Sequence, residues 1–132
     1  MNAVLKYPGA KNRLAPWIIQ HIPRHKVYCE PFLGSGAVFF NKEPAYNEIL
    51  NDLDDDVYNF FKILRERPDE LIRLINFTPY CRKEYEAAYL NSAESDLEKA
   101  KIFAIKCWQG FGCGNKYKNG FDFGGKNAKV TM

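Results

Sequence analysis

Long apolar runs are absent: no stretch approaches the roughly 18 consecutive apolar residues of a membrane span. The N-terminus also lacks the apolar segment and the small-residue cleavage site of a secretory signal. We therefore expect a cytoplasmic protein with no membrane partner. At roughly 150 residues per domain, a chain of 132 residues is expected to form about one compact unit.

Cysteine and histidine are scarce, and none of them has the spacing of a metal site. There is no Cys-x-x-Cys pair, and neither histidine has a second potential ligand near it in the sequence. The sequence therefore predicts no metal site and no disulfide framework, but reduced and partly buried thiols. The residues concerned are Cys29, Cys81, Cys107, Cys113, His21 and His25.

Apolar and aromatic residues are plentiful, because 46% of the residues are hydrophobic and 15% are aromatic, which argues against disorder. The charges divide unevenly. Residues 1–26 carry five Lys or Arg and no acid, residues 99–132 carry seven Lys against Asp122, and residues 27–98 hold 7 basic and 15 acidic groups. Cationic ends suit a polyanion such as nucleic acid. Charge alone nevertheless favours a plainer interpretation, that the lysines keep the surface soluble.

Hydrophobic periodicity and turn residues predict an ordered series of elements. The predicted elements are a helix over 14–22, a strand over 26–30, the opening of a short helix at 37–40, a strand over 46–50, helices beginning at 55 and 68, a helix over 82–90, a capped helix from 95 to 108 and a glycine-rich loop or hairpin over 110–125. Two strands are fewer than a parallel sheet normally needs. We therefore predict an α/β protein whose chain stops part-way through a larger fold.

One strand-turn-strand segment carries a sign of chemistry. A strand leads into Gly34-Ser35-Gly36, and Asp52 ends the next strand, 16 residues after Gly36. Glycine lets a backbone pass close to a ligand, and an acid in this place accepts hydrogen bonds from ribose hydroxyls. The pattern predicts a nucleoside-cofactor site. Phe39 replaces the third glycine of the dinucleotide fingerprint and no Gly-Lys-Ser or Gly-Lys-Thr occurs, which argues against a nicotinamide-type site and a P-loop.

Three motifs in this order resemble the Dam-like (D12 class) adenine-N6 DNA methyltransferases, which use S-adenosylmethionine. Lys6–Lys11 resembles that family's N-terminal motif, Glu30–Gly36 its Phe-x-Gly-x-Gly cofactor loop, and Asn51–Leu53 its ribose-binding acid. The resemblance implies a partial Rossmann-like methyltransferase fold. Residues 1–66 would form its cofactor-binding part, and residues 67–132 the helical start of a DNA-recognition region with a basic tail.

The same resemblance implies a set of cofactor-binding residues. Lys11 would lie near the methionine carboxylate, Tyr7 would contact the cofactor through its ring, and Asp52 would hold the ribose. Taken singly, each has a plain structural alternative, such as a surface aromatic, a solvated charge or a helix N-terminal acid. The three acids at 54–56 are expected to be solvated residues of a helix's first turn, with a place near the adenine as the alternative for one of them. The implied cofactor residues are Tyr7, Lys11, Glu30, Phe32, Gly34, Gly36 and Asp52.

The family's catalytic motif, Asp-Pro-Pro-Tyr, is missing. The seven prolines are never adjacent. In the family this motif accepts hydrogen bonds from adenine N6 and stacks on the flipped base, so no catalytic residue is predicted here and the chain alone is not expected to methylate DNA. The chain is expected to stop inside the recognition region. The alternatives are a non-catalytic S-adenosylmethionine- or DNA-binding remnant, or one subunit of a split enzyme whose second polypeptide supplies the motif.

Double-stranded DNA is the partner that the family implies. Lysines interleaved with aromatics on a glycine-rich tail have the composition of a nucleic-acid contact, although a loosely ordered end explains them equally well. The pair Phe121-Asp122 resembles a Phe-Asn pair of the family. The residues predicted to contact DNA are Lys116, Lys118, Phe121 and Lys126.

Overall fold

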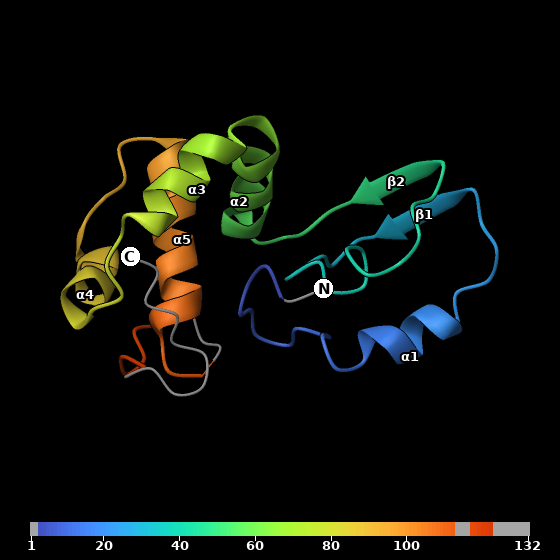
Figure 1. Cartoon of the computed structure of the whole chain (residues 1–132), viewed down its shortest axis with the longest axis horizontal. Coiled ribbons are helices and arrows are strands. Elements are labelled where there is room, and N and C mark those ends of the chain that lie inside the picture. Colours follow the sequence, from blue (N-terminus) through green and yellow to red (C-terminus); the bar gives the residue numbers. More distant parts are fainter. Residues whose placement is uncertain (1–2, 113–116, 123–132) are drawn as a thin grey trace.

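The structure is a computed structural model that describes residues 3–112 and 117–122. These residues form a mixed α/β arrangement of a small parallel sheet and five helices (Figure 1). The elements in chain order are α1 (Ala15–Gln20), β1 (Val27–Glu30), β2 (Asn47–Leu50), α2 (Asp55–Glu66), α3 (Pro68–Asn76), α4 (Arg82–Leu90) and α5 (Asp96–Gln109).

The sheet and α1 form one half of the molecule (Figure 1). Strands β1 and β2 pair in parallel, in a register that runs from Val27 opposite Asn47 to Glu30 opposite Leu50. Ala15 of α1 is buried against Ala37 and Val38, which follow β1. Because the strands are parallel, the residues after Glu30 and after Leu50 leave the sheet at the same edge.

Helices α2 to α5 form the other half around a larger core. The N-terminal segment belongs to this core, since Leu5 is fully buried among residues of α2, α3 and α5. The Trp108 indole N–H donates to the Val4 carbonyl at 3.1 Å, which fastens the segment to α5. The core thus unites residues from both sides of the boundary expected after residue 66. Its buried members are Leu5, Val57, Phe60, Ile63, Leu71, Ala100, Phe103, Ala104 and Cys107.

Two of the helices, α2 and α5, begin at a residue whose side chain caps them. The Ser95 hydroxyl accepts from the Glu98 backbone N–H at 3.2 Å and so caps α5, as predicted. The Glu98 carboxylate accepts from the backbone N–H of Glu94 at 2.9 Å, one residue before the cap. Asp54 caps α2 by accepting from the Asp56 backbone N–H at 3.0 Å.

Two predictions about local structure were wrong. The stretch from Ala37 to Phe40 forms turns rather than a helix, although the Phe40 N–H still donates to the Gly36 carbonyl at 2.9 Å. Two phenylalanines and a β-branched valine favour helix weakly in so short a run. Cys29 is exposed rather than partly buried. The described cysteines form no disulfide, and Cys113 lies outside the described residues.

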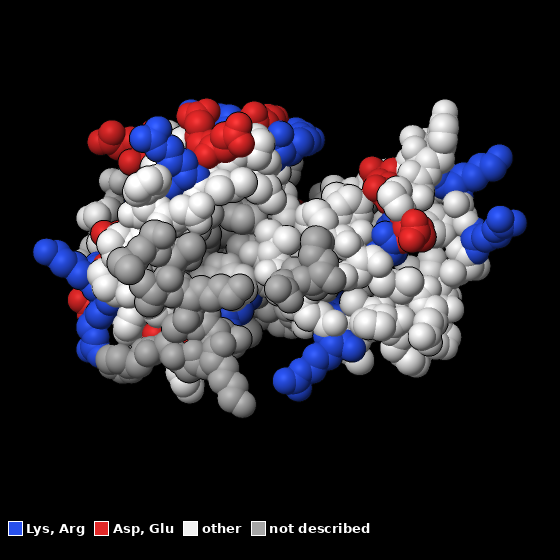
Figure 2. Space-filling model, in the orientation of Figure 1, with Lys and Arg blue, Asp and Glu red and all other residues white. Residues whose placement is uncertain are grey.

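None of the helices in the described part of the chain has the length and apolar character to cross a membrane. Figure 2 shows acidic and basic side chains side by side over the helical half. The acidic middle stretch of the sequence thus also presents basic side chains, as in the pairs Arg65–Glu66 and Arg67–Glu70.

Candidate cofactor site

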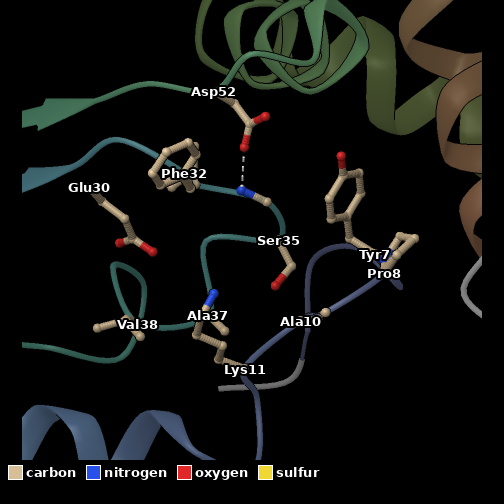
Figure 3. A pocket seen from close by; sticks show the side chains of 13 residues that line it. Tyr7, Pro8, Ala10, Lys11, Glu30, Phe32, Ser35, Ala37, Val38 and Asp52 are labelled. Carbon is tan, nitrogen blue, oxygen red and sulfur yellow. Dashed lines mark hydrogen bonds between the residues drawn. The ribbon is translucent and has the colours of Figure 1, made fainter.

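A pocket of about 290 Å³ lies at the edge where β1 and β2 end (Figure 3). Three segments line it: the loop from Tyr7 to Lys11, the stretch from Glu30 to Val38, and Asp52. The volume is close to the lower end of the roughly 300–1,000 Å³ of small-molecule sites. The structure thus brings together six of the predicted cofactor residues, namely Tyr7, Lys11, Glu30, Phe32, Gly34 and Asp52. The remaining one, Gly36, supports the turn without lining the pocket.

The glycine turn needs glycine at two positions. Gly34 and Gly36 have φ angles of 53° and 68°, a region that side chains strongly disfavour. A Cβ at Gly36 would lie 2.6 Å from the Phe40 ring, and one at Gly34 would lie 3.3 Å from the Tyr7 ring. The turn is therefore closely packed by aromatic rings, in addition to being shaped by its dihedral angles.

Asp52 holds the turn to the end of β2. Its carboxylate accepts from the Gly34 N–H at 2.7 Å (dashed in Figure 3) and from the Asp54 N–H at 3.0 Å. The backbone pairing continues beyond the strands in the same place, because the Leu33 N–H donates to the Asn51 carbonyl at 2.9 Å. Asp52 still lines the pocket, and each of its oxygens keeps a lone pair for a further donor.

Tyr7 stands at the side of the pocket that faces the helices, with its hydroxyl directed toward them (Figure 3). The hydroxyl donates to the Asp54 carboxylate at 2.9 Å, and the ring centroid lies 6.3 Å from that of Phe103 in α5. Burial, and then the bond to Asp54, raise the pKa of Tyr7, so the phenol stays protonated. The prediction that Asp54 is merely a solvated first-turn acid was wrong, because its carboxylate has two partners.

Glu30 and Lys11 place opposite charges in the pocket. Glu30 ends β1, and its carboxylate accepts from the Tyr28 hydroxyl at 2.9 Å on the same face of the strand. Burial raises the pKa of Glu30, while the Tyr28 bond and the nearby Lys11 act in the opposite direction. The backbone carbonyl of Lys11 accepts from the first turn of α1, which fixes where its side chain starts. A ligand with both an ammonium and a carboxylate would meet a partner for each.

Comparison with known proteins shows the family to which this chain belongs. The model of the D12 class N6 adenine-specific DNA methyltransferases matches residues 7–110, which include every segment that lines the pocket. The chain belongs to this family.

Three curated proteins are among the relatives of this chain. It is 32% identical over 94 residues to the type II methyltransferase M1.LlaDCHI of Lactococcus lactis subsp. cremoris, covering 70% of the chain and 32% of that protein. It is 34% identical over 108 residues to the DNA N-6-adenine-methyltransferase of Escherichia phage P1, covering 76% of the chain and 14% of that protein. It is 39% identical over 72 residues to the DNA adenine methylase of Serratia marcescens, covering 54% of the chain and 26% of that protein. The chain thus spans about a third or less of these relatives.

Of the residues predicted to contact DNA, Lys118 and Phe121 are described, and neither of them lines the pocket. Phe121 packs with its ring centroid 5.6 Å from that of Tyr80 and 6.0 Å from that of Tyr85, so its side chain contributes to the packing of the described tail. The Lys118 ammonium is half exposed and lies 3.9 Å from the Glu86 carboxylate of α4. Lys116 and Lys126 lie outside the described residues.

Two residues near the pocket were missed by the sequence interpretation. Tyr28 could have been found from its place two residues before Glu30 on a strand, since alternate residues share a face. Asp54 has no such local signal, because its partner Tyr7 is 47 residues away. Within residues 3–112 and 117–122, no group of three potential ligands could hold a metal ion.

Proposed function

We propose that this chain binds S-adenosylmethionine in the pocket between Tyr7, Glu30 and Asp52, as the cofactor-binding part of a site-specific DNA adenine-N6 methyltransferase. The observation that carries the proposal is the convergence of six motif residues from three separate segments on one pocket. Membership of the D12 class supports the same cofactor and a DNA substrate.

The chemistry of the lining suits the two ends of the cofactor's amino acid and its ribose. Lys11 would receive the methionine carboxylate, and Glu30 would receive the ammonium. Asp52 would accept from ribose hydroxyls with the lone pairs that its two backbone bonds leave. When bound, S-adenosylmethionine supplies an activated methyl group; the residues named here bind and orient it.

The methyl acceptor would be an adenine of double-stranded DNA, with an Asp-Pro-Pro-Tyr motif completing the site. No adjacent prolines occur in these 132 residues, so we propose that the motif comes from another stretch of polypeptide, either of the same protein or of a second one. A partial Rossmann-like arrangement of the sheet belongs to the same proposal, since β1 and β2 are parallel and carry the pocket at their carboxyl edge.

Calorimetric titration of S-adenosylmethionine into the 132-residue chain tests the proposal. Lys11→Met is the informative variant, because it removes a charge from the pocket while keeping the length of the side chain. Lys26→Met is its matched control, since Lys26 is exposed and is not among the pocket's lining residues. We expect saturable binding, a loss of about tenfold or more in Lys11→Met, and no change in Lys26→Met. Absence of heat from the folded wild-type chain at two well-separated temperatures would refute cofactor binding by this part.

A methylation assay then separates an enzyme part from a remnant. A polypeptide carrying the Asp-Pro-Pro-Tyr segment of a D12 relative is added to the chain and to Lys11→Met, with DNA and methyl-labelled cofactor. Transfer that needs both polypeptides and falls in Lys11→Met supports a catalytic role. Cofactor binding without transfer in any combination favours a non-catalytic remnant.

A further inference from the structure

The two carboxylate oxygens of Asp54 accept hydrogen bonds from two different parts of the chain. Oδ1 accepts from the Asp56 N–H at 3.0 Å and caps α2, and Oδ2 accepts from the Tyr7 hydroxyl at 2.9 Å. A cap needs one oxygen only, and Asn or Ser would cap as well as Asp. Because the amide of Asn has one acceptor oxygen and the carboxylate has two, only Asp can cap the helix with one oxygen and accept from Tyr7 with the other.

The bond to Tyr7 closes a ring of contacts around the wall of the pocket. The Gly34 N–H donates to Asp52, Asp52 accepts from the Asp54 N–H, and Asp54 accepts from Tyr7. The aromatic ring of Tyr7 completes the series of contacts at Gly34, because it lies 3.3 Å from the position that a Cβ on Gly34 would occupy. This closed series of contacts joins the glycine turn, the end of β2 and the N-terminal loop, which are the three segments that line the pocket.

We propose that Asp54 is a positioning residue of the cofactor site: it holds the Tyr7 ring against the glycine turn and so fixes the wall of the pocket to the first turn of α2. This inference rests on the proposed function where it concerns cofactor affinity. Its structural part, the placement of Tyr7 by Asp54, stands independently of any ligand.

The geometry gives Tyr7 few other ways of being held in this orientation. Its ring packs beside Phe103 and its backbone follows Leu5, which is buried in the helical core, so the segment arrives from the helical side. Packing alone leaves rotation about χ1 and χ2 to be decided by contacts at the tip of the ring. A hydrogen bond from a phenol to a carboxylate is among the stronger neutral-to-charged bonds, and it is directional.

A spectroscopic test on the free chain reports the placement directly. In the wild type, the α-proton of Gly34 that faces the Tyr7 ring should be shifted by the ring current. We expect Asp54→Asn, which keeps a cap, and Tyr7→Phe, which keeps the ring, to move this resonance, and the double variant to move it no further than the single ones. Asp55→Asn is the matched control, because it removes the same charge from the same helical turn at an exposed position.

An unchanged Gly34 resonance in both Asp54→Asn and Tyr7→Phe would overturn the inference, whatever the cofactor does. A shift of the same size in Asp55→Asn would also overturn it, because the effect would then be one of charge on α2. Circular dichroism of each variant shows whether α2 and its neighbours still fold. Should Asp54→Asn unfold, Tyr7→Phe alone decides, since it leaves the capping bond in place.

Titration with S-adenosylmethionine tests the consequence for binding. We expect Asp54→Asn and Tyr7→Phe each to raise Kd about fivefold to tenfold, the double variant to match the single ones, and Asp55→Asn to match the wild type. A wild type that does not bind refutes the proposed function, while the resonance still judges the placement of Tyr7. A wild type that binds, with unchanged Kd in both single variants, overturns the positioning role.

Discussion

The carboxylate of Asp52 accepts a hydrogen bond from the backbone N–H of Gly34 at 2.7 Å and thereby ties together the two chain segments that leave the parallel sheet. The same side chain also accepts from the Asp54 N–H. The acid that we propose to hold the ribose thus also fixes the structure of its own pocket. Variants at this position will change both properties.

Asp52→Ala should therefore lose more than cofactor affinity. Two backbone N–H groups lose their acceptor, at a cost of about 1–3 kcal/mol in the free energy of unfolding. Asp52→Asn keeps one acceptor oxygen and should lose less. Urea unfolding measures the stabilities, and amide exchange at Gly34 measures the bond, with faster exchange expected in the alanine variant. Equal exchange in the wild type and Asp52→Ala would show that the bond does not protect the turn.

Gly36→Ala should destabilise the chain through both its backbone and its neighbour. The positive φ costs roughly 1–2 kcal/mol for a residue with a Cβ, and the new methyl group would meet the Phe40 ring at 2.6 Å. Gly112→Ala is the control, because Gly112 has a φ of 71° and open space around it. We expect Gly36→Ala to have a lower Tm than Gly112→Ala. Adding Phe40→Leu to Gly36→Ala should bring its Tm closer to that of Gly112→Ala. Equal Tm values would contradict the steric part.

Glu30→Gln should stabilise the free chain at neutral pH. Burial raises the pKa of Glu30 above its ordinary value of 4.5, so the folded state disfavours the ionised form. Such a group stabilises the fold below pH 4.5, and that contribution is lost as the pH rises through the raised pKa. Thermal unfolding should give Glu30→Gln a higher Tm than the wild type at pH 7, with the difference vanishing toward pH 4.

The matched control for this effect is Glu43→Gln, because Glu43 is an exposed glutamate in the loop before β2. Its Tm should follow the wild type at pH 7. A fall in cofactor affinity together with a rise in Tm in Glu30→Gln would mark Glu30 as a residue kept for binding at the expense of stability. A lower Tm at pH 7 would contradict the expected sign.

If the tail contacts DNA, as the sequence predicts, then variants of Lys118 and Glu86 should change the affinity for DNA in opposite directions. Lys118→Met removes a cation that can neutralise a phosphate, and it should lower affinity and reduce the salt dependence of binding by about one charge. Glu86→Gln removes the acid 3.9 Å from Lys118 and should raise affinity. Both variants break the same ion pair, so fluorescence anisotropy with labelled duplex separates DNA contact from folding. Equal losses in both would indicate a structural effect.

Local signals in the sequence were sufficient for most of the elements. Pro23 follows the end of α1, and the acids before Val57 mark the start of α2. The Ser95 cap marks the start of α5. The stretch after Gly36 was mispredicted as a helix because an apolar run follows a strand and a glycine turn there. Val38 is in fact buried against α1, so tertiary packing rather than helical propensity determines this stretch.

The pocket was predictable as a list of motif residues, but its internal bonds were not. Asp52 and Gly34 are 18 residues apart, and Tyr7 and Asp54 are 47 apart. Which of the four acids at 52 and 54–56 receives a given donor depends on how the strands and α2 meet in space. The burial of Leu5 in the helical core could not be read from the sequence either, because a short N-terminal segment has no periodicity that names its partner.

The bond between the Trp108 indole and the Val4 carbonyl spans 104 residues of sequence. Contacts of such separation close a long loop and are slow to form. On the ribosome the N-terminal segment emerges first, yet the helix that receives it is made more than 90 residues later. The strand-turn-strand unit can assemble early, but the Tyr7 side of the pocket waits for α5. The Tyr7 side of the pocket is thus completed only once α5 is in place, so occupancy of the pocket would report that this long-range contact has formed.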